Sequence, residues 1–142
     1  IDRIGRIISD INKYFGELQS YKINSVSDLR DSLRYHASAM LVFSLLNRFL
    51  DLGSELLSKE SVGAPKDYDE DMPLLSKAGY INKKDADEIN NLINKRNVLA
   101  HFYYEINEKG LFDIIGKLNL IMDFIETIKK RIKKSFEEKK KG

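Results

Sequence analysis

The stretch from Arg96 to Tyr103, Arg-Asn-Val-Leu-Ala-His-Phe-Tyr, gathers side chains that can take part in chemistry. Arg96 stays protonated and can bind a phosphate with two parallel hydrogen bonds, and His101 can exchange a proton near neutral pH. Asn97 can orient either group. The set suits cleavage of RNA without a metal: His101 would take the proton of a ribose 2′-hydroxyl while Arg96 stabilises the charge that develops on phosphorus.

The spacing within this motif bears on whether one chain can supply the whole site. On an α-helix Asn97 and His101 are four residues apart and share a face, whereas Arg96 and His101 diverge by about 140°. Either the helix loosens near Ala100, or a second chain completes the pocket. The other histidine of the sequence, His36, lies within a long predicted helix. RNA cleavage also needs a group that gives a proton to the departing oxygen. A two-fold dimer that brings a second His101 would supply this proton donor.

The spacing alone is equally compatible with a structural role. An Arg-Asn pair near a helix end is often a cap or a surface ion pair, and a histidine after an apolar run is often packed. His36, next to Tyr35, is interpreted as a packed or surface residue. The acidic run from Asp67 to Asp71 lacks the spacing and the glycine of an EF-hand loop, so it is interpreted as acidic charge at a helix N-terminus.

Helices are expected to position the motif. Apolar residues recur every three or four positions along nearly the whole chain, which predicts an all-α fold, a bundle of about five helices. The predicted helices span about 4–18, 27–61 and 69–77, then from Asn82 into the motif, and from Leu111 onward.

Residue types that begin or end helices set these predicted boundaries. Ser25 or Ser27 can cap the second helix, and Gly63-Ala64-Pro65 is expected to end it. Gly79 suits the C-terminal end of the short third helix. Asn107 to Gly110 is predicted to be a turn.

The second helix is apolar on more than one face. Leu41, Leu45 and Leu52 belong to its main stripe, whereas Phe43 and Leu50 lie on other faces. A helix of this kind must be covered on several sides. Its neighbours in the bundle, or another copy of the chain, are expected to do so.

Length and composition narrow the class of protein. The 142 residues are expected to form a single domain, 1–142. The chain contains no cysteine, which excludes a disulfide, a thiolate zinc site and a thiol nucleophile. It contains no glycine-rich phosphate loop and no apolar run long enough for a membrane span. A cytoplasmic protein without metal or cofactor is expected.

Charge gathers at the C-terminal end. Residues 129–141 hold eight cations and two anions, a local charge of +6, so the rest of the chain carries +2 − 6 = −4. This basic C-terminal tail, from about residue 129, can meet RNA phosphates or an acidic partner. It can also be a solvated helix terminus that frays, because cations favour helix C-termini.

The chain resembles a known family in several places. Arg96 to Tyr103 matches the Arg-x4-His-x-Tyr signature of HEPN-domain proteins, the higher eukaryotes and prokaryotes nucleotide-binding group, and is most similar to the HepT-like toxins. The runs Leu50–Glu55, Gly63–Pro65 and Leu75–Ile81 are similar to the family's in order and spacing. The likeness therefore covers most of the chain.

The resemblance implies a HEPN-like bundle that forms a symmetric homodimer with a site built from both motifs. It implies a metal-independent endoribonuclease that leaves 2′,3′-cyclic phosphates and acts as the toxin of a toxin–antitoxin pair. Arg96 and His101 match the catalytic pair, and Asn97 the polar residue after the arginine. The antitoxin would be a minimal nucleotidyltransferase (MNT) that adds AMP to Tyr103, with Tyr104 beside it as a second acceptor.

Two further expectations complete the prediction. Asp51 and Ser54 on the second helix can line the site, as polar residues of that helix do in the group, or can be exposed polar positions. An alternative function is a non-catalytic helical partner that binds a nucleotide or serves as a docking surface for the nucleotidyltransferase.

Overall fold

The computed structural model describes residues 2–60, 70–102 and 106–141. These residues form a bundle of helices. At residues 2, 100–102, 136 and 141 it describes the backbone alone. The elements are α1 (Asp2–Ser20), the 3-10 helix η1 (Val26–Arg30), α2 (Ser32–Leu57), α3 (Asp71–Lys77), α4 (Lys83–Phe102) and α5 (Glu108–Lys141). The described residues contain no strand, so the predicted all-α bundle of five helices is confirmed.

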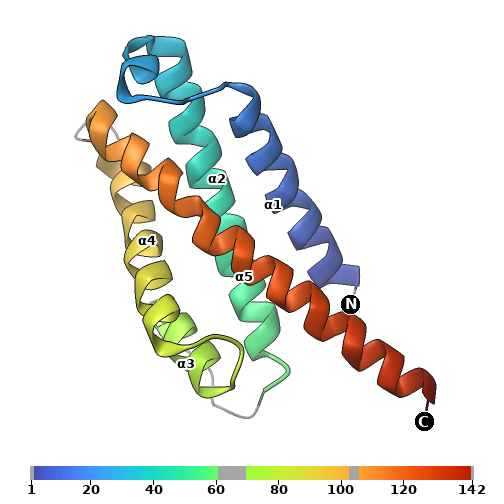
Figure 1. Cartoon of the computed structure of the whole chain (residues 1–142). Coiled ribbons are helices and arrows are strands. Elements are labelled where there is room, and N and C mark those ends of the chain that lie inside the picture. The colour runs from blue at the N-terminus through green and yellow to red at the C-terminus, as the bar shows by residue number, and fades with distance from the viewer. Residues whose placement is uncertain (1, 61–69, 103–105, 142) are drawn as a thin grey trace.

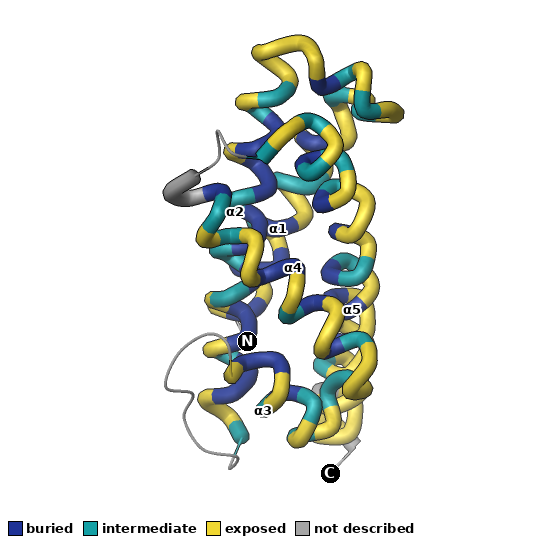
Figure 2. Tube along the Cα trace, turned by 90° about the vertical axis from the view of Figure 1, so that its left-hand side faces the viewer, coloured by how far each residue is buried: buried dark blue, intermediate teal, exposed yellow. Residues whose placement is uncertain are grey.

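Four long helices run side by side, and the short α3 closes one end (Figure 1). α2 contacts each of the other helices, which makes it the central element. Figure 2 shows that buried residues gather where the helices face one another and exposed residues on their outer sides. Phe49 of α2 is 1% exposed and packs edge-on against Phe124 of α5, with ring centroids 5.8 Å apart. No helix of the described residues is long and apolar enough to cross a membrane.

The predicted second helix is divided, and the single helix expected over 27–61 is wrong at its beginning. The 3-10 helix η1 comes first, and Asp31 with ψ of 118° then interrupts the helix before Ser32. The Asp28 carboxylate accepts hydrogen bonds from the backbone N–H groups of Asn24 and Ser25, at 2.9 and 3.1 Å. Ser25 therefore caps η1 and not α2, because Asp28 holds this turn closed.

Helix α2 also ends earlier than predicted, and α3 begins later. α2 ends at Leu57 and α3 begins at Asp71, two residues after the expected start. The predicted break at Gly63–Pro65 lies outside the described residues. The predicted end of α3 is confirmed, because Gly79 follows it with a φ of +87°, which glycine adopts without strain.

The last helix begins earlier than predicted. Residues 107–110 are not a turn: Asn107 precedes α5, and its side-chain oxygen accepts a hydrogen bond from the N–H of Gly110 at 2.8 Å. α5 continues to Lys141, so residues 129–141 are helical and not a frayed tail. Asn82 caps α4 in the same way, since its Oδ1 accepts from the N–H of Asp85 at 2.8 Å, as predicted.

A contact around Tyr80 ties the far part of α5 to the turn between α3 and α4. Arg131 lies over the Tyr80 ring at 3.9 Å and donates to the carbonyl oxygen of Gly79 at 3.2 Å. The Tyr80 hydroxyl donates to Glu60, just after α2, at 2.6 Å. Burial and then this hydrogen bond to a carboxylate raise the pKa of Tyr80. Three separate parts of the chain thus meet at one ring.

Candidate functional site

Residues 96–102 of the motif lie on α4, whose backbone is helical from Lys83 to Phe102. The helix does not loosen near Ala100, so the first of the two alternatives raised by the spacing is wrong. Asn97 and His101 therefore share a face of α4, and Arg96 diverges from His101. The side chain of His101 is outside the described residues. A second chain remains the predicted way to complete the site.

Arg96 is half-buried and is held between two amide oxygens. Its Nη1 donates to Oδ1 of Asn47 on α2 at 3.0 Å, and its Nη2 donates to Oδ1 of Asn97 at 3.1 Å. Both acceptors are uncharged, so they fix the direction of the guanidinium without cancelling its charge. A positioned cation of this kind can stabilise negative charge on a phosphate.

Asn47 is a residue that the sequence reasoning missed. Its contact with Arg96 joins positions 49 residues apart in the sequence, which no local pattern reveals. A signal was nevertheless present: Asn47 is a polar residue inside the apolar stretch between Met40 and Leu52. An amide in such a place indicates a specific hydrogen-bond partner, because an unsatisfied polar group costs stability when it is covered.

Asp51 and Ser54 share a face of α2 with Asn47, because they follow it by four and seven residues. Both are exposed. The Asp51 carboxylate accepts a hydrogen bond from Nη1 of Arg48 at 2.9 Å, and Nε of Arg48 binds Asp10 on α1 at the same distance. The hydrogen bond to Asp51 contributes most to raising the pKa of Arg48, and the hydrogen bond to Asp10 raises it further. Asp51 is thus linked to α1 through Arg48, which binds both Asp51 and Asp10.

The same face of α2 carries an exposed apolar stripe. Leu33 and Met40 are 82% and 63% exposed, and with Asn47 they recur at intervals of seven residues. Phe43 and Leu50, which are half-buried, lie beside Leu33 and Met40 on α2. A seven-residue apolar repeat is typical of a helix that packs against another helix. We call Leu33, Met40, Phe43 and Leu50 the α2 stripe. It leads along α2 to the Asn47–Arg96 contact.

Three further predicted candidates can be placed relative to the motif. His36 is exposed on α2 and packs edge-on against Tyr35, with ring centroids 5.4 Å apart, as predicted for a surface histidine. The Tyr35 hydroxyl donates to the carbonyl oxygen of Ile106, which fixes the chain just before α5. Tyr103 and Tyr104 lie outside the described residues.

The described residues contain no group of three His, Asp or Glu side chains that could hold a metal ion. On the described face of α4, the motif presents an oriented guanidinium and an amide. These groups can bind and polarise an anion, and a proton-transfer group must come from elsewhere on the helix or from a second chain.

A protein-family model matches most of the chain. The model described as "Ribonuclease HepT-like" matches residues 6–130. The chain belongs to the HepT-like ribonuclease family. The match includes α2, the whole of α4 and most of α5, and so contains the Arg96 site and the α2 stripe.

Solved structures of the same fold extend this finding. A toxin–antitoxin crystallised with AMP-PNP is similar to the HepT-like chain, with a TM-score of 0.82 at 18% identity, and covers 91% of this chain and 98% of its own. A tri-AMPylated Shewanella oneidensis HEPN toxin in complex with an MNT antitoxin has a TM-score of 0.81 at 19% identity with the same coverage.

A third structure has no assigned role. YutE from Bacillus subtilis, a cytosolic protein of unknown function, has a TM-score of 0.77 at 20% identity and covers 92% of this chain and 91% of its own. At identities this low the likeness establishes the fold. No curated protein sequence matches the chain.

Proposed function

We propose that this HepT-like protein is an endoribonuclease toxin that cleaves RNA without a metal ion at a site shared by two copies of the chain. The observation that carries the proposal is the Arg96 guanidinium, which Asn47 and Asn97 hold in place. Arg96 lies on α4, the helix that also carries His101. The family match, to ribonucleases, supports the class of reaction.

The proposed reaction is a transesterification that releases a 5′-hydroxyl end. His101 of one copy takes the proton of the ribose 2′-hydroxyl, and the 2′-oxygen bonds to phosphorus as the bond from phosphorus to the 5′-oxygen breaks. His101 of the other copy gives a proton to the departing oxygen. Arg96 stabilises the negative charge on the phosphoryl oxygens in the transition state. The product ends are a 2′,3′-cyclic phosphate and a 5′-hydroxyl.

The α2 stripe supports the second copy as a homodimer partner. Leu33 and Met40 expose apolar side chains, although the rest of the apolar side chains of α2 are half-buried or buried. A two-fold contact through this face would cover them and would bring two copies of the Arg96 site close together. Asp51 and Ser54, on the same face, would then line the shared site.

An MNT antitoxin is the proposed regulator. The Shewanella oneidensis neighbour is an AMPylated HEPN toxin bound to such a protein, which supports the same control here. Tyr103, two residues after His101, is the proposed acceptor, and Tyr104 is the alternative. An AMP group there would place a negative charge where the RNA phosphate must bind, and so block cleavage.

The test is cleavage of end-labelled RNA in EDTA by the wild type, Arg96→Ala, His101→Ala and a control, Arg6→Ala, which changes an exposed arginine of α1. We expect cleavage by the wild type and the control, with cyclic phosphate ends, and none by the two motif variants. Intact mass spectrometry of the same sample distinguishes unmodified from AMP-bearing protein. Unmodified wild type that spares every RNA tested would contradict the proposal and favour a non-catalytic nucleotidyltransferase partner.

A further inference from the structure

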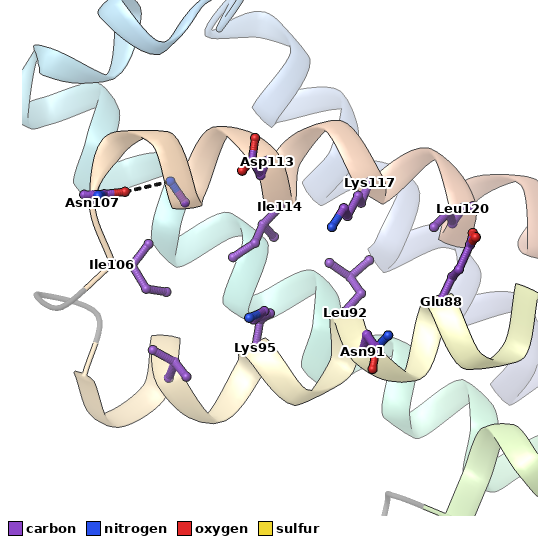
Figure 3. A pocket seen from close by; sticks show the side chains of 12 residues that line it. Glu88, Asn91, Leu92, Lys95, Ile106, Asn107, Asp113, Ile114, Lys117 and Leu120 are labelled. Atoms are coloured by element: carbon purple, nitrogen blue, oxygen red, sulfur yellow. Dashed lines mark hydrogen bonds between the residues drawn. The ribbon is translucent and has the colours of Figure 1, made fainter.

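A cleft of about 590 Å³ lies between α4 and α5, and Val98 is the one residue of the motif among its described lining residues. Figure 3 shows its walls: α4 along one side, α5 along the other, and α2 behind them. Along α4 it extends from Glu88 to Val98, which at 1.5 Å per residue is about 15 Å. Its volume is in the range of small-molecule sites, and its shape is elongated.

The floor of the cleft is apolar. Leu92 and Val98 come from α4, Ile114 and Leu120 from α5, and Ile106 closes one end. In Figure 3 Leu92 and Ile114 point into the space between the two helices. A ligand body that fills this space would remove apolar surface from water, which is favourable.

Two lysines of opposite walls face the same cleft. Lys95 rises from α4, and Lys117 extends from α5 towards α4 near Leu92 (Figure 3). Neither lysine takes part in an ion pair with another of the described residues. Of the acidic lining residues, Asp113 points away from the space between the helices and Glu88 lies at the far end. The middle of the cleft is therefore positively charged above an apolar floor.

The cleft is separate from the Arg96 site. On α4, Lys95 points about 160° from Asn97 and about 100° from Arg96. Leu92 is only about 40° from Arg96, but the Arg96 guanidinium is turned to Asn47 of α2. Arg96, Asn97 and Asn47 are not among the described residues that line the cleft, so the cleft is a different site from the Arg96 contact. What binds in the cleft does not depend on whether the motif cleaves RNA.

We propose that this cleft binds a small amphiphile with one anionic head group and an elongated apolar body, such as a medium-chain fatty carboxylate. The head group lies between the ammonium groups of Lys95 and Lys117. The body lies along Leu92 and Ile114, towards Ile106. The two cations provide charge-assisted hydrogen bonds, and the apolar floor excludes ligands that are charged along their whole length.

The test uses anilinonaphthalene sulfonate, a fluorescent anion with an apolar body, and its displacement by decanoate. The wild type is expected to enhance the fluorescence, and decanoate is expected to reverse the enhancement while decanol, which lacks the charge, does so far less. The double variant Lys95→Glu/Lys117→Glu is expected to bind the probe about tenfold more weakly or worse, because both charged contacts become repulsive.

The matched control is Lys13→Glu/Lys84→Glu, which changes two exposed lysines outside the cleft by the same total charge. It is expected to bind like the wild type, and circular dichroism confirms that both double variants are folded. Equal binding by the two double variants, or equal displacement by decanol, would overturn the proposal. Displacement by an RNA oligonucleotide and not by decanoate would also overturn it. Arg96→Ala, included in the same assay, is expected to keep binding whether or not the motif cleaves RNA.

Discussion

The amide of Asn47 helps to set the direction of the Arg96 guanidinium, because its oxygen accepts a hydrogen bond from Arg96 across two helices. Replacing Asn47 by alanine removes this contact and leaves the charge of Arg96 unchanged. We expect the rate of RNA cleavage at saturating substrate to fall by about tenfold to a hundredfold, since small displacements of a catalytic group cost rates of this size. The melting temperature is expected to change little, because Asn47 is half-buried.

The variant Asn47→Asp separates positioning from a structural role. An aspartate can still accept the hydrogen bond but adds a negative charge next to Arg96, so binding of the RNA phosphate is expected to weaken and KM to rise. Ser44→Ala, one turn earlier on α2, serves as the control. If Asn47→Ala cleaves RNA as fast as the control does, Asn47 does not position Arg96.

Tyr80 gives a prediction for alkaline pH. Its pKa is raised above the ordinary value of 10.0, by burial and then by the hydrogen bond to Glu60. The folded protein therefore holds this proton to higher pH than the unfolded chain, and the stability that the contact provides is present below pH 10.0 and is lost as the pH rises through the raised pKa. The stability of the Tyr80→Phe variant is therefore expected to fall less than that of the wild type over this alkaline range.

Melting temperatures measured from neutral pH to above the ordinary tyrosine pKa test this prediction. The wild type and Tyr80→Phe are compared with Tyr14→Phe, a half-buried tyrosine of α1. The difference between the wild type and Tyr80→Phe should shrink as the pH rises. A difference that stays constant across the range would show that the Tyr80 proton does not affect stability.

At the scale of the elements, two helical glycines are expected to respond differently to alanine. A Cβ at Gly116 in α5 meets nothing within 4 Å, so Gly116→Ala is expected to stabilise the protein by about 0.5–1 kcal/mol through reduced backbone freedom of the unfolded chain. A Cβ at Gly53 in α2 would lie 3.1 Å from Oδ2 of the buried Asp71. Gly53→Ala is expected to gain less than Gly116→Ala, or to destabilise.

Urea unfolding of the two variants measures this difference directly. Both substitutions add the same methyl group to a helix, so the helix propensity cancels in the comparison. An equal gain at both positions would mean that the Asp71 side chain moves aside at no cost.

Helix boundaries were predictable where a local side chain sets them. Asn82 and Gly79 were found from the sequence because a capping amide and a left-handed glycine act on their nearest neighbours. The sequence around Asn107 predicts a turn, although Asn107 is a cap of the same kind as Asn82. The extended backbone of Asp31, which separates η1 from α2, has no comparable local signal.

The candidate site was only partly predictable for a related reason. Arg96 and Asn97 could be named because they belong to one short motif, and the structure joins them by a hydrogen bond. Asn47 could not, because its role depends on how α2 packs against α4. Contacts between helices distant in sequence are set by packing, and periodicity gives the faces of helices but not their partners.

At the scale of the whole molecule, the α2 stripe predicts that the protein is dimeric. Burial of the Leu33 side chain would contribute about 1.5–3 kcal/mol to association, and burial of Met40 a similar amount. The double variant Leu33→Lys/Met40→Lys is therefore expected to raise the dimer dissociation constant by about a hundredfold or more, as measured by analytical ultracentrifugation. RNA cleavage should be lost in parallel, and should return in part at high protein concentration.

The control for this prediction is Lys13→Ala/Lys84→Ala, at exposed positions outside the stripe. A double stripe variant that remains dimeric would show that the chain associates through another face. A monomer that cleaves RNA at the wild-type rate would show that one chain supplies the whole site.

Arg131 has a consequence for where the chain can be cut. The family match ends at residue 130, one position before the arginine that covers Tyr80 and binds Gly79. A fragment trimmed to the boundary of sequence similarity would keep the motif and lose the clamp that holds the end of α5 to the turn between α3 and α4. The strongly basic helix end thus includes, near its start, a residue that belongs to the folded body, and a shortened protein meant for crystallisation should end beyond Arg131.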